Sequence, residues 1–273
     1  MIPEESVNKL ASKQVSKLFF EKLVQKGNKF KSIFYRAEFD SSNPLPAHLL
    51  TCLPATHFVK AFEEMQPEHT LCLDLTVSKD ELLAQMKQKG RYNIKVAERS
   101  NMTIDFPADE DKALTDFYEL YSATAKRHRI TYRNKAYFES LIAHLKSSGQ
   151  VALGIARIKE NNQEIPVAAA IIVYSGKKAI YLFGASSDQY RNLMAPYLLH
   201  WQIIQSCKEK GCTTYDFFGI APNDDPAHPW AGVTRFKKQF GGSERSILGS
   251  YDLPLRPLEY QFFKFAEKIR RKQ

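Results

Sequence analysis

The pattern of hydrophobic and polar residues changes its period several times along the chain, and each change predicts a new element of secondary structure. Helical spacing and capping residues predict helices within residues 5–27 and over 47–53, 78–86, 109–129, 135–145, 196–210 and 258–272. Alternation predicts strands over residues 31–39, 69–77, 150–158, 165–174, 178–183 and 213–218. Because helices and strands are mixed along the chain, we expect an α+β protein.

Residues at the ends of these elements support the prediction. Ser78 can cap the helix that follows it, with Glu81 in the capping-box position three residues later. The strands between residues 150 and 183 are joined by short turns, as in three successive antiparallel strands. Helices followed by such a meander, a helix ended by Gly211 and a further strand is the order of the GCN5-related acetyltransferase fold, a mixed sheet flanked by helices.

Charge and cysteine usage narrow the function. A net charge of +9 and a pI near 9.2 indicate a phosphate-rich partner, although such a surplus can also be spread over a solvated surface. No apolar run approaches the ~20 residues that cross a bilayer, and the first ten residues lack the features of a signal peptide, so we expect a cytoplasmic protein. The four cysteines, Cys52, Cys72, Cys207 and Cys212, have no zinc spacing, and no metal is expected. Cys72 and Cys207 are expected in the core.

One stretch, Tyr215 to Gly242, combines a strand, a polar loop and a cluster of basic and aromatic residues. The loop after Gly219 is rich in Pro, Asn and Asp, which predicts irregular structure. The cluster contains Arg235, Phe236, Lys237, Lys238 and Phe240 and lies just before a double glycine. Loops that follow strands frequently carry binding and catalytic residues. Two interpretations fit: a functional site, or a solvated loop with a basic edge.

A second basic segment follows the helix over 78–86. Four of its cations, Lys87, Lys89, Arg91 and Lys95, are candidates for contact with the phosphates of an RNA. The alternative is a solvated helix face. We expect a mixture of the two, in which Tyr92, Ile94 and Ala97 are structural and pack inward, while some of the lysines and Arg91 act electrostatically.

Several motifs in the same order resemble those of the FemABX peptidyltransferases. The last is Y-D-F-x-G-I from Tyr215, a polar loop, and then G-V-x-x-F-K-x-x-F-G-G ending at Gly242. Earlier ones are Gln66-Pro67 before the strand TLCLDL, KGRYNIKVA from Lys89, and YLFGAS from Tyr181 followed by APYLL and Trp201. Together they cover residues from about 66 to 252, and RYNI with the later FKxxFGG is a specific combination.

The resemblance implies a domain organisation. FemABX proteins contain two acetyltransferase-like folds side by side. Here it implies a complete catalytic domain over residues 69–248 and a shortened N-terminal half, 1–68, joined by the C-terminal segment 249–273. The shortened half lacks several opening strands, which puts any substrate contact from that region in doubt.

The resemblance also implies an activity, the transfer of an amino acid from aminoacyl-tRNA to an amine of a peptidoglycan precursor. The acceptor would be a muropeptide carried on UDP or on a lipid. Because an aminoacyl ester is already activated, the protein mainly has to align its substrates and stabilise an oxyanion. No cofactor is expected.

The resemblance assigns roles to particular residues. Lys237 matches the lysine of the F-K motif and is expected to stabilise the oxyanion, with Phe236 shaping the site. Arg133, Tyr137 and Tyr181 match residues near the precursor's phosphates, and Arg235 is grouped with them. Competing interpretations place Tyr137 and Tyr181 in the core and pair Arg133 with an acid.

The base that accepts the proton is less defined by sequence. It could be the substrate itself or a carboxylate such as Asp74 or Asp216, each of which lies on a predicted strand. An Asp in such a position is equally consistent with a turn or with a helix-dipole partner.

Coenzyme A fits this chain poorly. The stretch Arg191–Pro196 stands where related acetyltransferases have a glycine-rich pyrophosphate loop, and here Met194 and Pro196 replace its small residues. Met194 crowds the approach and Pro196 has no N–H to donate. A coenzyme A-dependent N-acyltransferase and a non-catalytic precursor- or tRNA-binding homologue remain as alternative functions.

The predicted helix over 258–272 is amphipathic and basic. Its apolar side contains Phe262, Phe263, Phe265 and Ile269. Two uses fit: peripheral contact with the anionic inner membrane surface, and covering the shortened N-terminal half.

Overall fold

The computed structural model describes residues 18, 20–39, 58–106, 110–128 and 132–270. These residues form two compact units, one from His69 to Arg245 and one made of the described residues up to Glu68 together with those from Ser246 on. The sequence predicted that the larger domain ends at residue 248, whereas the larger unit of the structure ends at Arg245. The predicted helix over 47–53, most of the one within 5–27, and Cys52 lie outside the described residues.

The larger unit is built on a seven-stranded sheet with the order β4-β5-β6-β7-β8-β3-β9. In that order, the strands span Thr103–Asp105, Val151–Glu160, Gln163–Ser175, Lys178–Ser186, Thr214–Gly219, His69–Asp74 and Ser243–Ser246. The three strands β5, β6 and β7 pair antiparallel, as the sequence predicts, whereas β7 and β8 pair parallel. A crossing helix must therefore join β7 to β8, because parallel neighbours need a crossover connection.

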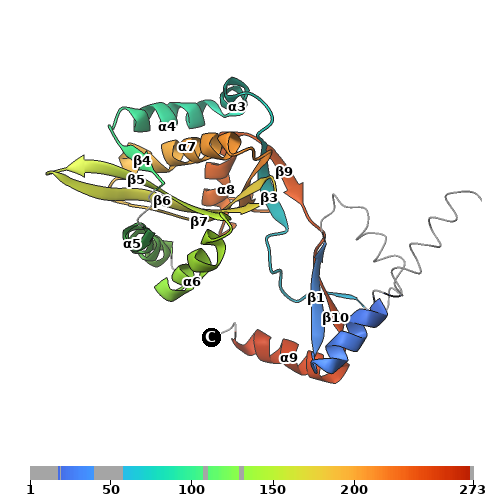
Figure 1. Cartoon of the computed structure of the whole chain (residues 1–273). Helices are drawn as coiled ribbons and strands as arrows, with labels where there is room; N and C mark the ends of the chain where they lie inside the picture. Colours follow the sequence, from blue (N-terminus) through green and yellow to red (C-terminus); the bar gives the residue numbers. More distant parts are fainter. Residues whose placement is uncertain (1–17, 19, 40–57, 107–109, 129–131, 271–273) are drawn as a thin grey trace, which may run out of the picture. The chain divides into compact units, whose positions relative to one another are not determined.

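Helices cover both faces of this sheet (Figure 1). On one face lie α5 (Glu110–His128) and α6 (Lys135–Lys146), whose buried side chains pack with those of β5 and β6. On the other lie α3 (Lys79–Gln85), α4 (Gln88–Glu98) and α7 (Ala195–Glu209). The observed architecture is the expected α+β fold, a mixed sheet flanked by helices.

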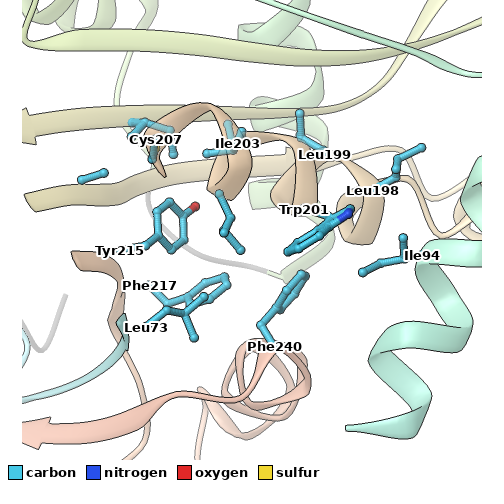
Figure 2. Close-up of a cluster of buried hydrophobic side chains, with 14 of the residues drawn as sticks. Leu73, Ile94, Leu198, Leu199, Trp201, Ile203, Cys207, Tyr215, Phe217 and Phe240 are labelled. Atoms are coloured by element: carbon cyan, nitrogen blue, oxygen red, sulfur yellow. The ribbon is translucent and has the colours of Figure 1, made fainter. Parts of the chain in front are cut away.

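Helix α7 is the centre of the larger core. Figure 2 shows Tyr215, Phe217 and Phe240 directed toward α7 from the opposite side of this core, with Trp201 of α7 between them and Ile94 of α4. Tyr215 and Phe217 are fully buried, and so is Cys207. Cys72 and Cys212 are buried as well, and the prediction that Cys72 and Cys207 are core residues is confirmed.

A bulge in β7 separates two aromatic side chains that the sequence places on one face. Ile171 pairs with Phe183 and Ile172 pairs with Tyr181, so Leu182 is an extra residue in the register. Tyr181 consequently belongs to the core under α7, and Phe183 belongs to the core under α5 and α6. Gly184 lies beside the Tyr181 phenol, where any larger side chain would collide with it.

Several local predictions hold. Ser78 caps α3 in a capping box with Glu81 (Ser78 N to Glu81 Oε2, 2.7 Å), and Pro196 lies in the first turn of α7. The stretch after Gly219, predicted as irregular, contains the helix α8 (Ala231–Lys237) and a 3-10 turn, η2 (Lys238–Phe240). The prediction missed α8 because its seven residues are too few for a helical period to be recognised.

Gly241 and Gly242 hold the end of η2 against the sheet. Both have positive φ angles, 80° and 86°. A Cβ atom would lie 2.6 Å from the Gln85 carbonyl oxygen at Gly241 and 2.5 Å from the Cys72 carbonyl oxygen at Gly242. The double glycine of the sequence motif therefore allows backbone to approach backbone, which fixes where α8 and η2 sit.

The smaller unit contains a helix over 20–29, a three-stranded sheet and helix α9 (Pro257–Arg270). The strand order is β1 (Phe34–Phe39), β10 (Gly249–Pro254), β2 (Val59–Lys60). Asp252 of β10 is fully buried, and its carboxylate accepts two hydrogen bonds from Arg36 (2.7 and 2.8 Å) and one from the Tyr260 hydroxyl (2.7 Å). These bonds attach α9 to the sheet.

Candidate active site

Lys237, the last residue of α8, has an unusual environment for an ammonium group. Its side chain is 6% exposed, and Nζ donates a hydrogen bond of 2.6 Å to the Gly219 carbonyl oxygen. Nζ also lies 5.6 Å from the centre of the Tyr181 ring. Burial lowers the pKa of Lys237 to about 8, and the negative charge of Asp216 partly opposes that shift. Such a lysine is charged at neutral pH but poorly solvated, so it can stabilise a nearby anion strongly.

The carbonyl that Lys237 contacts is held by an irregular strand end. Phe218 has a φ angle of 62°, a left-handed conformation that is unfavourable for an aromatic residue. Asp216 stabilises it, because Oδ1 accepts a hydrogen bond of 2.8 Å from the Phe218 N–H while Oδ2 pairs with Lys178 Nζ at 2.6 Å. Asp216 is 2% exposed. Its observed contacts therefore position Gly219 and, through it, Lys237.

Aromatic rings and one histidine surround Lys237 and Tyr181. The His200 ring packs edge-on against Tyr181 with centroids 4.4 Å apart, and it also contacts Phe236 at 5.5 Å. His200 Nδ1 lies 3.0 Å from the Tyr215 hydroxyl. Burial, with the charge of Lys237 as a smaller contribution, lowers the pKa of His200 to about 3, so its imidazole is neutral. His200 is not among the residues predicted from the sequence, because a lone His on an apolar helix carries no recognisable spacing.

A cavity of about 560 Å³ opens beside these rings. Tyr181 of β7 and Phe236 and Val233 of α8 form part of its wall, together with Pro196 at the start of α7. Its polar lining includes Thr124, Arg127, Ser186, Asp188 and Arg191. A half-apolar cavity with a few convergent polar groups is the usual form of a substrate site, so we take this cavity as the candidate active site.

The amide groups at the start of α7 do not fit a coenzyme A pyrophosphate. The Met194 N–H donates to the Arg191 carbonyl oxygen at 3.3 Å, and Pro196 has no N–H. Met194 itself has a φ angle of 54°. Two amides that such a cradle uses in acetyltransferases are therefore unable to donate to a ligand.

The opposite side of α8 borders a second cavity, of about 540 Å³. Its lining includes Lys87, Arg235 and Lys238, with Asp224 and Glu244. Lys238 pairs with both carboxylates, at 2.8 Å and 2.7 Å. Within the described part of the chain, the guanidinium of Arg235 has no such partner. Consecutive residues of one helix thus face two cavities: Phe236 faces the candidate active site, and Arg235 faces the second cavity.

The four cations of the second basic segment belong to helix α4 and its N-cap. Lys89 and Lys95 are exposed on α4, and Lys87 is its N-cap residue. Arg91 Nη1 instead donates to backbone carbonyls at the end of α3, among them those of Met86 and Leu83. Its observed contact is therefore a structural one.

The expectation that Tyr92 packs inward was wrong. Helix α4 buries Gly90, Asn93, Ile94 and Ala97, whereas Tyr92 is 63% exposed. Positions 90, 93, 94 and 97 share one helix face, and residue 92 lies on the other. Tyr92 is consequently an exposed aromatic side chain among lysines.

The side chains of Arg133 and Tyr137 are in contact, although Arg133 lies before the helix that contains Tyr137. Asn134 caps α6 by accepting from the Tyr137 N–H at 3.0 Å, so Arg133 precedes the helix. Its guanidinium carbon lies 4.8 Å from the centre of the Tyr137 ring, and it forms no ion pair among the described residues. Tyr137 also packs edge-on against Phe138 and Phe183. The Tyr137 ring thus lies at the edge of the core, and the exposed Arg133 guanidinium packs over it.

Asp74 lies away from Lys237. It pairs with Thr214 at the start of β8, whereas Gly219 ends that strand, roughly 16 Å further along. Its Oδ1 accepts hydrogen bonds from the Thr76 N–H (2.8 Å) and hydroxyl (2.7 Å), which lower the pKa of Asp74. These contacts form a turn at the strand end, the alternative that the sequence left open for this residue.

Two features are absent from the residues that the structure describes. They contain no group of three or more His, Cys, Asp or Glu side chains arranged to hold a metal ion. None of the helices that they form is long and apolar enough to cross a membrane.

The fold is that of the GCN5-related acetyltransferases, and comparisons with known proteins give the family. The model of the FemAB family matches residues 55–159 and 150–268, so the chain belongs to the FemAB family. The curated relatives include Lipid II:glycine glycyltransferase of Staphylococcus aureus, which is 22% identical over an alignment of 262 positions; the alignment covers 73% of this chain. The chain spans 62% of the length of that relative.

Solved structures support the fold. The crystal structure of FemX superposes with a TM-score of 0.81 at 20% identity and covers 92% of this chain and 79% of FemX. The structure of L-PGS from Bacillus licheniformis gives a TM-score of 0.54 at 11% identity, covering 87% and 72%. A tandem GNAT protein from the clavulanic acid biosynthesis pathway gives 0.50 at 12%, covering 88% and 69%. The acetyltransferase-like fold and the family expected from the motifs are confirmed.

Proposed function

We propose that this protein transfers an amino acid from aminoacyl-tRNA to an amine of a peptidoglycan precursor stem peptide, forming part of an interpeptide bridge in cell wall biogenesis. The family membership supports a transferase of this kind, and the name of the Staphylococcus aureus relative supports a lipid-linked muropeptide as acceptor. The observation that carries the proposal is Lys237, a buried cation beside the cavity lined by Tyr181 and Phe236.

The reaction needs a stabilised anion more than a nucleophile on the protein. The amine of the acceptor attacks the ester carbonyl carbon of the donor, a C–N bond forms, and the carbonyl oxygen becomes negatively charged. The C–O bond to the ribose then breaks, the ribose oxygen takes up a proton, and the amine loses one. An ammonium has three N–H donors, and Lys237 uses one on Gly219, which leaves two for that oxyanion.

The surroundings of Lys237 suit this role. The low exposure of the site strengthens the attraction between the ammonium and an oxyanion, because water screens it less. Phe236 and Tyr181 give the cavity flat walls against which an aminoacyl ester can be oriented. The proton released by the amine passes to the substrate or to solvent in this scheme, since the carboxylate of Asp216 is occupied by Lys178 and the Phe218 N–H.

Residues outside the active-site cavity are assigned to binding of the two substrates. We assign Arg133, with Tyr137 beneath its guanidinium, to the phosphates of the acceptor. The tRNA would be met by Arg235 and by the basic surface of α4 with Lys87, Lys89 and Lys95. This assignment moves Arg235 from the acceptor to the donor, because it faces the cavity that it shares with Lys87.

A transfer assay tests the proposal. Purified protein is incubated with labelled aminoacyl-tRNAs and either a UDP-linked or a lipid-linked muropeptide, with acetyl-CoA as a parallel donor. We expect label on a muropeptide from tRNA alone, and the product identifies the amino acid and the acceptor. Transfer from acetyl-CoA alone would replace the proposal with an N-acyltransferase, and binding of both substrates without transfer would indicate a non-catalytic homologue.

A further inference from the structure

Helix α9 has apolar side chains on two faces, and the fold uses one of them. On the inner face Tyr260 is buried, and Phe263 packs against Phe34 at 5.5 Å and Phe62 at 5.9 Å. The outer face carries four large apolar side chains, namely Leu258, Phe262, Phe265 and Ile269, which are 87%, 74%, 61% and 48% exposed. Their spacing of four, three and four residues aligns them in one stripe along the helix. Within the described residues this stripe has no cover.

Cations flank the stripe. Lys264 and Lys268 form no ion pair in the described part of the chain, whereas the acids of the helix are neutralised, Glu259 by Arg256 and Glu267 by Arg270. The helix over 20–29 and the turn after it add exposed lysines at positions 22, 26, 29 and 31. Phe30, in the same segment, is 65% exposed. The described part of the smaller unit therefore combines exposed aromatic side chains with several exposed cations.

A shallow hollow of about 370 Å³ lies along the same helix. It is lined by Phe62, Gln261, Lys264, Phe265 and Lys268. Two phenyl rings and two ammonium groups around one hollow match the boundary between acyl chains and phosphate groups in a bilayer.

We propose that the outer face of α9 binds the surface of a membrane that contains anionic phospholipid. Leu258, Phe262 and Phe265 enter the acyl boundary, and Lys264 and Lys268 contact lipid phosphates. The helix lies in the plane of the interface. The inference deepens the proposed function, in which a lipid-linked acceptor must be reached at a membrane, and vesicle binding tests it without any acceptor.

The experiment is sedimentation of the full chain with vesicles of phosphatidylcholine alone or mixed with phosphatidylglycerol. We expect binding to the mixed vesicles that weakens at high salt. Phe262→Ser with Phe265→Ser should reduce the partition coefficient by about tenfold or more, and Lys264→Gln with Lys268→Gln should reduce it on the anionic vesicles only. Met65→Ser is the control, because Met65 is 65% exposed in the same unit but lies outside α9.

Other occupants of the stripe would give different results. A second copy of the chain would produce a dimer in sedimentation velocity that the double serine variant abolishes, with no vesicle binding. A segment of this chain outside the described residues would leave the protein monomeric and unbound. Either result overturns the inference. Loss of transfer in the presence of normal vesicle binding would instead contradict the proposed function alone.

Discussion

The Lys237 ammonium and the Gly219 carbonyl oxygen, 2.6 Å apart, join the end of α8 to the end of β8. The contact places a cation where the sheet ends, beside a cavity with aromatic walls. Asp216 supports it from the strand side by holding the left-handed Phe218. The proposed chemistry depends on this arrangement.

Lys237→Met should abolish most of the activity without unfolding the protein. Methionine has a similar volume and removes a charge that is costly to bury, so stability should be unchanged or higher. The value of kcat should fall by about 100- to 1,000-fold, the usual effect of losing an oxyanion-stabilising donor. Single-turnover transfer and chemical denaturation measure the two effects. Lys79→Met is the control, because Lys79 pairs with Glu209 on the surface and lines neither cavity. Equal losses in both variants would remove Lys237 from its role.

The pH dependence of kcat should report the ionisation of Lys237. If the ammonium is the active form, this group supports full activity below its pKa of about 8, and activity falls as pH rises through that value. The charge of Asp216 raises the pKa of Lys237, so Asp216→Asn should move the fall to lower pH. Comparing the two proteins cancels the titration of the substrate amine. A shift to higher pH, or no shift, would contradict this account.

Arg133→Ala should weaken binding of the acceptor. The guanidinium is exposed, stacks on Tyr137 and has no carboxylate partner among the described residues, so it can bind a phosphate at little cost. We expect Kd for a UDP-linked muropeptide to rise about tenfold or more, measured by calorimetry, with a smaller effect on kcat. Arg256→Ala is the control, since Arg256 pairs with Glu259 on the surface. An unchanged Kd would exclude Arg133 from the acceptor site.

Gly242→Ala should destabilise the protein more than an alanine at another left-handed glycine. The Cβ atom would lie 2.5 Å from the Cys72 carbonyl oxygen, so η2 or β3 has to move. Gly176 also has a positive φ, 58°, but has no atom within 4 Å of the added carbon. Gly176→Ala should cost about 1 kcal/mol and Gly242→Ala clearly more, as measured by urea denaturation. Similar costs would show that the close approach is easily relaxed.

His200→Gln should remove part of the acid sensitivity of folding. The pKa of His200 is about 3 in the folded protein, because of burial and the charge of Lys237, and about 6.5 in an unfolded chain. The unfolded state therefore binds more protons between these values. The free energy of unfolding is therefore highest above pH 6.5 with respect to this group, and it decreases as pH falls, by about 2 kcal/mol at pH 5. Glutamine does not titrate, so the unfolding free energy of the variant should fall less from pH 7.5 to 5. Parallel curves would contradict the burial of His200.

Short-range signals explain which parts of the fold could be predicted. The capping box of Ser78 and Glu81, the antiparallel meander and the start of α7 at Pro196 each depend on residues a few positions apart. The sequence motifs brought together Phe236, Lys237 and Tyr181 as candidates. They could not show that Asp74 lies at the opposite end of β8 from Lys237, since antiparallel register depends on pairing between distant strands.

The amino-acid sequence by itself determined the family, the antiparallel meander with the long helices before and after it, and the excess of basic residues. Tertiary structure decided the site. The bulge at Leu182 turns Tyr181 toward His200 and Phe183 away from it, and that bulge is a property of the pairing with β6. The bond from Lys237 to Gly219 spans 18 residues, and the burial that lowers the pKa of Lys237 comes from rings on β7, α7 and α8. Burial and register are set by contacts between segments far apart in the chain, so local patterns do not contain them.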